Sequence, residues 1–117
     1  MDIFPLVYRC AVVIKPKQPM LDWLNSIDPS HEPSLEEICK DSHAYLVPDY
    51  EDVADLEKAI DKYLKANYEG IFLNELTAWY TAPDMFPKMN YTLFQAWFET
   101  SYHTMVFDTV NKPITKE

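Results

Sequence analysis

An apolar run that ends at closely spaced prolines constrains the fold of this chain more than any other feature. Residues Val7 to Ile14 are β-branched or apolar at nearly every position, which is typical of a strand that lies centrally in a sheet. Pro16 lacks a backbone N–H and disfavours a helical conformation at the residue before it, so the strand is expected to end there. Pro19 suits the first turn of a helix, which an Asp-Pro pair at 28–29 would end. The sequence therefore predicts a strand that leads directly into a helix.

Four further segments have the apolar spacing or the capping residues of helices. Ser34 and Glu37 form a capping box, in which each side chain satisfies the backbone N–H of the other residue. Gly70, the only glycine in the chain, is expected to end the longest helix as a left-handed cap. The predicted helices, after the one that starts near Pro19, are Leu35 to Lys40, Val53 to Asn67, Phe72 to Tyr80, and Leu93 to Phe98 with Asn90 as its cap.

Two further strands complete the predicted sheet. Ala44 to Val47 is apolar and stops at Pro48, and Thr104 to Val110 alternates between apolar and polar residues. A chain of 117 residues is long enough for one hydrophobic core and too short for two. We therefore predict a single α+β domain over residues 1–117, with about three strands in one largely antiparallel sheet, four to five helices packed on it, and a polar C-terminal tail from about residue 111.

The charge of the chain argues against nucleic acids as partners, and its hydropathy argues against a membrane span. Nineteen acidic residues against ten basic ones give a net charge of −9, and Arg9 is the only arginine. Because affinity for nucleic acids depends largely on cations that displace counterions from phosphates, direct binding is not expected. No apolar run approaches the roughly 20 residues of a membrane span, and the N-terminal sequence lacks the basic leader of a secretion signal. We expect a cytoplasmic protein in which Cys10 and Cys39 are free thiols.

The scarcity of glycines and of metal-ligand motifs argues against several classes of enzyme. Phosphate-binding loops, dinucleotide fingerprints and nucleophile elbows all need glycines where the backbone turns sharply or approaches a ligand. The sequence has no paired CxxC motif and no HExxH motif, and no third group is at hand to orient His43 as a base for Cys39. We therefore predict no cofactor, no metal ligand and no catalytic residue, and favour a protein without enzymatic activity.

Polar residues near the end of the first strand form a candidate ligand site. Lys15 closes that strand, Asp22 lies near the start of the next helix, and Asp108 lies in the predicted third strand. If the strand ends meet at one edge of the sheet, these residues would surround a shallow cleft for a small polar ligand. The alternative is a structural cluster of ion pairs. The candidate ligand site comprises Lys15, Lys17, Gln18, Asp22, Trp23 and Asp108.

A second candidate is the proline-bracketed loop from Tyr80 to Tyr91. It contains Met85, Phe86 and Met89 without the periodicity that would bury them in a helix or strand. Exposed Met and Phe side chains on a stiffened loop are typical of interaction surfaces. The alternative is that the loop folds back onto the core.

The segment Lys15 to Ser26, KPKQPMLDWLNS, resembles one in small uncharacterised bacterial proteins that share a KPKQPxxDWLxS pattern. Those proteins are also similar to this chain in size, in acidity and in a Phe-x-x-Trp-Phe helix followed by a strand, here Phe94 to Phe98 and Met105 to Asp108. The resemblance implies a bacterial cytoplasmic protein and transfers neither an activity nor a site residue.

Three functions fit these observations. The first is a non-enzymatic protein–protein interaction module, which includes self-association as a homodimer, because the chain is acidic, rich in aromatic residues and poor in catalytic motifs. The second is a small-ligand-binding protein or enzyme that uses the Lys/Asp site at the end of the first strand. The third is an acidic mimic of nucleic acid that occupies a DNA-binding protein.

Overall fold

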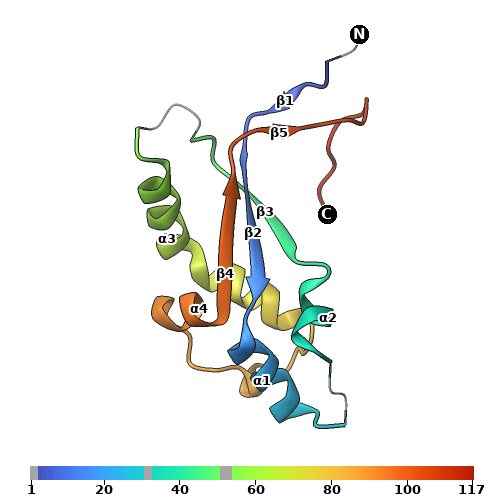
Figure 1. Ribbon diagram of the computed structural model, residues 1–117, viewed down its shortest axis with the longest axis vertical. Coiled ribbons are helices and arrows are strands. Elements are labelled where there is room, and N and C mark those ends of the chain that lie inside the picture. The colour runs from blue at the N-terminus through green and yellow to red at the C-terminus, as the bar shows by residue number, and fades with distance from the viewer. Residues whose placement is uncertain (1–2, 31–32, 51–53) are drawn as a thin grey trace.

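The computed structural model describes residues 3–30, 33–50 and 54–117 (Figure 1). Its centre is a three-stranded sheet in which β2 (Cys10–Pro16) lies between β3 (His43–Val47) and β4 (Phe98–His103). Both neighbours run antiparallel to β2, with Ile14 opposite His43 on one side and opposite Thr100 on the other. The end of β2 at Pro16 therefore lies beside the start of β3 and of β4.

One face of this sheet carries the hydrophobic core. Successive side chains of a strand point to opposite faces, and Cys10, Val12 and Ile14 are fully buried on one of them. The helices α3 (Leu56–Thr77) and α4 (Tyr91–Trp97) pack on this buried face. Aromatic rings from α3, α4 and β4 meet at the centre of the core, with ring centroids 5.3–5.8 Å apart: Phe72, Phe94, Trp97 and Phe98.

Two short helices close the lower end of the sheet as drawn in Figure 1. Helix α1 (Gln18–Ile27) follows β2 directly, and α2 (Leu35–Cys39) leads into β3. They form a second, smaller cluster in which Leu21, Leu24 and Ile38 are buried. A single 3₁₀ turn, η1 (Pro83–Met85), lies in the loop between α3 and α4. Within the described residues, no helix is long and apolar enough to cross a membrane.

The two ends of the chain form an arm that projects from the opposite end of the sheet. Here β1 (Leu6–Val7) pairs with β5 (Val106–Phe107), antiparallel, in a two-stranded ribbon that no described helix covers (Figure 1). We call residues 3–9 and 104–117 the arm; its last residues, 111–117, are exposed and form no helix or strand. The arm makes the molecule long, 52 × 30 × 26 Å, and raises its radius of gyration to 16.3 Å, compared with about 13 Å for a compact chain of this length.

The predicted α+β class, with four to five helices and three antiparallel strands in one sheet, is confirmed, and three of the predicted elements differ in their boundaries. Gly70 does not end a helix: α3 is one helix of 22 residues, and no glycine has a positive φ. The third strand of the main sheet is Phe98–His103 instead of Thr104–Val110, whose centre pairs with β1 in the arm. The first predicted strand is divided by a bend at residues 8–9 between β1 and β2.

Candidate functional site

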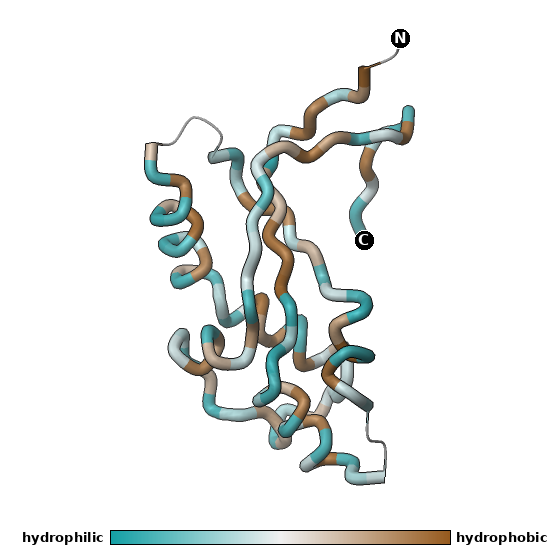
Figure 2. The backbone as a smooth tube through the Cα atoms, viewed as in Figure 1, coloured by the Kyte–Doolittle hydropathy of each residue, from teal (hydrophilic) through white to brown (hydrophobic). Residues whose placement is uncertain are grey.

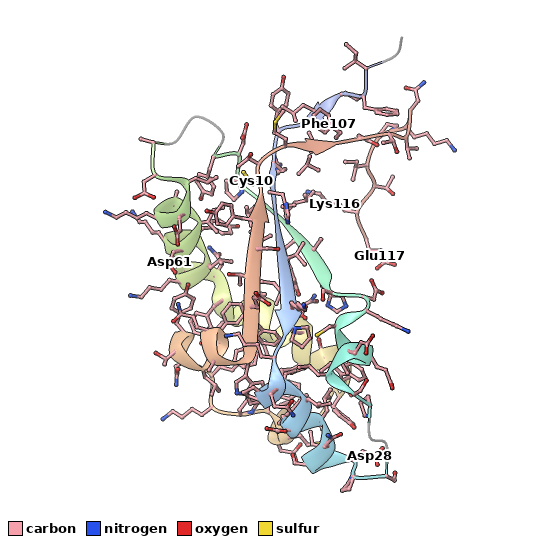
Figure 3. All side chains as sticks on the ribbon, viewed as in Figure 1. Cys10, Asp28, Asp61, Phe107, Lys116 and Glu117 are labelled. Carbon is pink, nitrogen blue, oxygen red and sulfur yellow. The ribbon has the colours of Figure 1, made fainter. Side chains whose placement is uncertain are left out.

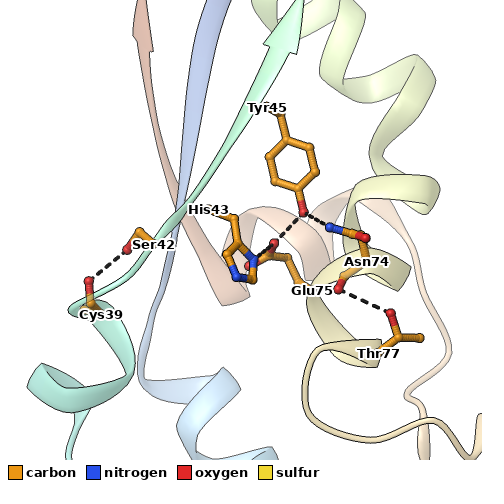
Figure 4. Close-up of polar contacts among 7 residues, drawn as sticks. All are labelled: Cys39, Ser42, His43, Tyr45, Asn74, Glu75 and Thr77. Atoms are coloured by element: carbon orange, nitrogen blue, oxygen red, sulfur yellow. Dashed lines mark hydrogen bonds and ion pairs between the residues drawn. The ribbon is translucent and has the colours of Figure 1, made fainter. Parts of the chain in front are cut away.

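A buried carboxylate joins β3 to α3. Glu75 is only 4% exposed and is the one buried charged side chain among the described residues. His43 and Tyr45 lie two residues apart in β3, so both side chains point to the face that α3 covers. Nδ1 of His43 lies 2.7 Å from Oε2 of Glu75, and the Tyr45 hydroxyl donates to the same oxygen (Figure 4). Nδ2 of Asn74 donates to the Tyr45 hydroxyl at 2.8 Å.

These contacts compensate for the hydration that the carboxylate loses on burial. Removing a carboxylate from water costs several kcal/mol, and a hydrogen bond to a charged group returns about 1.5–3 kcal/mol. Because a carboxylate accepts and does not donate, Nδ1 of His43 carries the proton in its contact with Glu75. Burial, and after it the hydrogen bond to Glu75, raises the pKa of Tyr45 above its ordinary value. Tyr45 therefore stays protonated and remains a donor to Glu75.

A pocket of about 270 Å³ opens beside Glu75. Its walls come from α2, the turn after it, the start of β3 and the end of α3. Glu75 lines it together with His43, Asp41, Glu37 and Trp79, which are all exposed at the surface. Both hydrogen bonds recorded for the Glu75 side chain go to Oε2, and no described residue donates to Oε1.

The structure brings together three of the six residues predicted as a ligand site. Lys15, Lys17 and Gln18 line one hollow of about 550 Å³, and Cys39 and Lys40 from α2 and its C-terminus line it too. Two acidic residues, Glu36 and Glu99, also border this hollow. Nζ of Lys17 donates to the backbone carbonyl of Gln95 at 2.9 Å, so one of the lysines is tied to α4.

The other three predicted residues do not join this hollow. Asp22 accepts a hydrogen bond from Gln18, 2.9 Å long, on the exposed side of α1. Trp23 lies in an aromatic group with Tyr80, Phe86 and Trp97. Asp108 follows β5 in the arm, where its N–H donates to the carbonyl of Pro5. Since β2 is antiparallel to both neighbours, its C-terminal end at Lys15 meets their N-terminal ends, while Asp108 lies at the far end of the sheet.

The loop from Tyr80 to Tyr91 partly fits each of the two expectations, an exposed interaction surface and a loop folded back onto the core. Phe86 and Met89 are partly buried against the main core, and Nε1 of Trp23 donates to the carbonyl of Met85 at 2.9 Å. The Met85 side chain itself is 45% exposed. The loop therefore folds back onto the protein and leaves one of its three predicted contact residues at the surface.

Neither cysteine forms a disulfide, and both are free thiols. Cys10 is buried in the core, and Sγ of Cys39 donates to the carbonyl of Pro16 at 3.2 Å. His43 is directed to Glu75 and not to Cys39. Among the described residues, no three His, Cys, Asp or Glu side chains gather closely enough to hold a metal ion.

A further hollow, of about 580 Å³, lies between the first half of α3, α4 and β4. The hydroxyl of Tyr91 donates there to Oδ1 of Asp61 at 2.6 Å, and burial, and after it this hydrogen bond, raises the pKa of Tyr91. This contact has the same chemistry as the hydrogen bond from Tyr45 to Glu75, a hydroxyl that donates to a carboxylate. It differs in burial, because Asp61 is exposed and Glu75 is buried.

Large apolar side chains are exposed mainly on the arm. Of the twelve large hydrophobic residues exposed in the described part of the chain, seven lie there: Ile3, Phe4, Tyr8, Met105, Phe107, Val110 and Ile114. When the residues are coloured by their hydropathy, apolar stretches lie on both strands of the ribbon (Figure 2). Phe107 lies beyond Cys10, away from the helices and from Asp61 (Figure 3).

No protein-family model, no curated protein and no solved structure matches this chain.

Proposed function

We propose that this protein is a non-enzymatic interaction module that associates with a second copy of itself through the arm. The observation that carries the proposal is the concentration of seven exposed large apolar residues on a ribbon that has no covering helix in the described structure. A two-stranded ribbon is only marginally stable alone in water, because it has too little of its own surface to bury. Exposed apolar patches of this kind are typical of association surfaces.

The exposed apolar area of the arm is close to that of a standard protein–protein interface. The exposed fractions of the seven side chains run from 49% for Phe107 to 85% for Ile3. With about 150–200 Å² for each fully exposed large apolar residue, they amount to on the order of 700 Å² per copy. A standard stable interface buries about 800 Å² per partner. Contact that buries all seven side chains of each arm would therefore approach the size of a standard interface.

The distribution of charge favours a second copy as the occupant and the arm as the contact. The arm carries three basic residues, Arg9, Lys112 and Lys116, against two acidic ones, Asp108 and Glu117. The rest of the chain carries seven basic and seventeen acidic residues. Repulsion between two copies is therefore weakest where their arms meet, and the projecting shape of the arm keeps the acidic parts apart.

Sedimentation velocity over roughly 1–100 µM tests this proposal, since interfaces of this size bind in the micromolar range or tighter. Wild-type protein is expected to sediment as a dimer that dissociates on dilution. Ile3→Ser removes a large apolar side chain outside the strand pairing, and it should weaken the dimer by at least about tenfold. The matched control is Met85→Ser, which removes an exposed apolar side chain from the loop and should leave the dimer intact.

Two outcomes contradict the proposal. A wild-type protein that stays monomeric at the highest concentration has no self-associating arm. If Met85→Ser dissociates the dimer and Ile3→Ser leaves it intact, the contact lies on the loop and not on the arm. Circular dichroism of both variants checks that the fold is retained, because neither residue belongs to the buried core.

A second candidate function is the binding of a small anion in the hollow lined by Lys15, Lys17 and Lys40. Three ammonium groups around one depression favour an anionic ligand, although two carboxylates border it as well. Titration with inorganic phosphate at constant ionic strength, followed by the backbone amide signals, tests this candidate. Lys15→Ala should abolish saturable shifts; shifts that persist in this variant would rule out the hollow.

A further inference from the structure

We propose that the pocket beside Glu75 binds an organic cation, a guanidinium or alkylammonium group at the end of a short aliphatic chain. The proposal is independent of self-association through the arm, and it starts from the incomplete coordination of Glu75. This carboxylate is 4% exposed, yet both recorded hydrogen bonds reach only its Oε2 atom. Oε1 has no donor among the described residues, while Glu75 lines the pocket. A carboxylate oxygen without a protein donor, on a side chain that lines a pocket, can accept a hydrogen bond from an N–H group that enters the pocket.

The contacts that Glu75 already has do not supply a permanent cation. Its only ion-pair partner among the described residues is His43, whose side chain is 43% exposed and which is charged only when protonated. The second donor, Tyr45, is kept neutral by its raised pKa. Lys40 lines the same pocket but makes no ion pair with Glu75. A guanidinium or ammonium group that enters the pocket would therefore complete the neutralisation of this buried charge.

The rest of the pocket is suited to the same chemistry. Glu37 and Asp41 add two carboxylates to Glu75, so that acidic groups outnumber the basic ones, Lys40 and His43. Trp79 supplies an indole ring that is 42% exposed, and cations are attracted to the face of such a ring. The volume of about 270 Å³ fits the end of a side chain or a small amine, and it is below the range of about 300–1,000 Å³ for drug-sized ligands.

A titration with n-butylguanidinium chloride tests the proposal, with n-butylurea as its neutral counterpart of nearly equal shape. Both are added to ¹⁵N-labelled full-length protein at constant ionic strength. The cation should give saturable shifts in the backbone amides of Ser42, His43, Ala78 and Trp79, and n-butylurea should give none. Equal shifts with the two compounds, or shifts that do not saturate, would overturn the proposal.

Two variants separate binding from folding. Glu75→Gln keeps the size of the side chain and should weaken binding of n-butylguanidinium at least about tenfold, because it removes the charge that faces the pocket. If this variant does not fold, Trp79→Leu takes its place, since Trp79 is at the surface and its loss should weaken binding several-fold. The matched control is Trp79→Phe, which keeps an aromatic face and should bind nearly as well as the wild type. Unchanged binding in Trp79→Leu and, where it folds, Glu75→Gln would contradict the proposal.

The two natural sources of such a cation are distinguished by a third titration. A capped Gly-Arg-Gly peptide offers the same guanidinium group on a polypeptide backbone. Binding as tight as that of n-butylguanidinium, or tighter, would identify an arginine side chain of another protein as the ligand. Binding to n-butylguanidinium but not to the peptide would identify a free small cation.

Discussion

The replacement of Tyr45 by Phe tests directly how much the buried carboxylate depends on its neighbours. The substitution removes one oxygen atom and leaves the ring in place. Glu75, which is 4% exposed, then keeps His43 as its only donor among the described residues. A hydrogen bond to a charged group contributes about 1.5–3 kcal/mol, and the loss falls on a site that water reaches poorly. We expect Tyr45→Phe to lower the free energy of unfolding by about 2 kcal/mol.

Tyr91→Phe is the matched control for this prediction. The hydroxyl of Tyr91 also donates to a carboxylate, Oδ1 of Asp61 at 2.6 Å, but Asp61 is exposed and water can replace the lost donor. Tyr91→Phe should therefore lower the free energy of unfolding by at most about 1 kcal/mol. The difference between the two variants therefore measures the effect of burial on one kind of hydrogen bond.

Urea unfolding followed by tryptophan fluorescence provides the measurement. The midpoint should fall at an unchanged m-value, since the exposed surface of neither state changes much. In a thermal melt, Tyr45→Phe should lower Tm by about 8 °C, taking about 4 °C per kcal/mol for a chain of this size. The measurements are made in the Ile3→Ser background so that self-association does not contribute.

Equal costs for Tyr45→Phe and Tyr91→Phe would refute the reasoning, because burial of the acceptor would then make no difference. A double-mutant cycle provides a second check. In the Glu75→Gln background, Tyr45→Phe should cost only about 1 kcal/mol, since the acceptor is no longer charged. An undiminished cost there would mean that the Tyr45 hydroxyl stabilises the protein through Asn74 and not through Glu75.

Two further predictions follow from the same structure. Gly70→Ala should raise the free energy of unfolding by about 0.5–1 kcal/mol in urea melts. Gly70 lies in the middle of α3, is exposed to solvent, and an added Cβ would meet no atom within 4 Å. A lower free energy of unfolding in this variant would contradict a helical conformation at Gly70. The raised pKa values of Tyr45 and Tyr91 mean that the unfolded chain releases their protons near pH 10 while the folded chain retains them. Stability from these two groups is therefore complete below about pH 10 and declines above it, and the double variant with Phe at both positions should show a shallower decline in melts between about pH 9 and pH 11.

The boundaries that sequence analysis missed depend on tertiary contacts. The strand β4 has the polar sequence FETSYH, in which only Phe98 is buried, because it is an edge strand. Met105 and Phe107, which suggested a strand of the main sheet, are instead exposed on the arm. Gly70 has only a weak preference against helix at an exposed position, and the buried residues on either side of it, Leu64 and Ile71, keep α3 continuous.

The candidate site could be predicted only in part from the sequence, because its residues are far apart along the chain. Glu75 follows Ile71 by four residues and Phe72 by three, so a carboxylate on the apolar stripe of α3 could have been noticed from spacing alone. Its partners could not, because His43 and Tyr45 are 32 and 30 residues away along the chain. A shared site for Lys15 and Asp108 would require both residues to lie at the same end of the sheet. Because the strands are antiparallel, Lys15 and Asp108 lie at opposite ends of it.

That antiparallel geometry also separates the two proposals. The arm leaves the sheet at Cys10, whereas Pro16 lines the pocket that contains Glu75. The strand β2 of seven residues lies between them and spans about 20 Å, at roughly 3.3 Å per residue. Substitutions at sites so far apart usually act independently. A dimer that Ile3→Ser dissociates and that Glu75→Gln leaves intact would therefore support the arm without bearing on the pocket, and cation binding retained in monomeric Ile3→Ser would support the pocket without the arm.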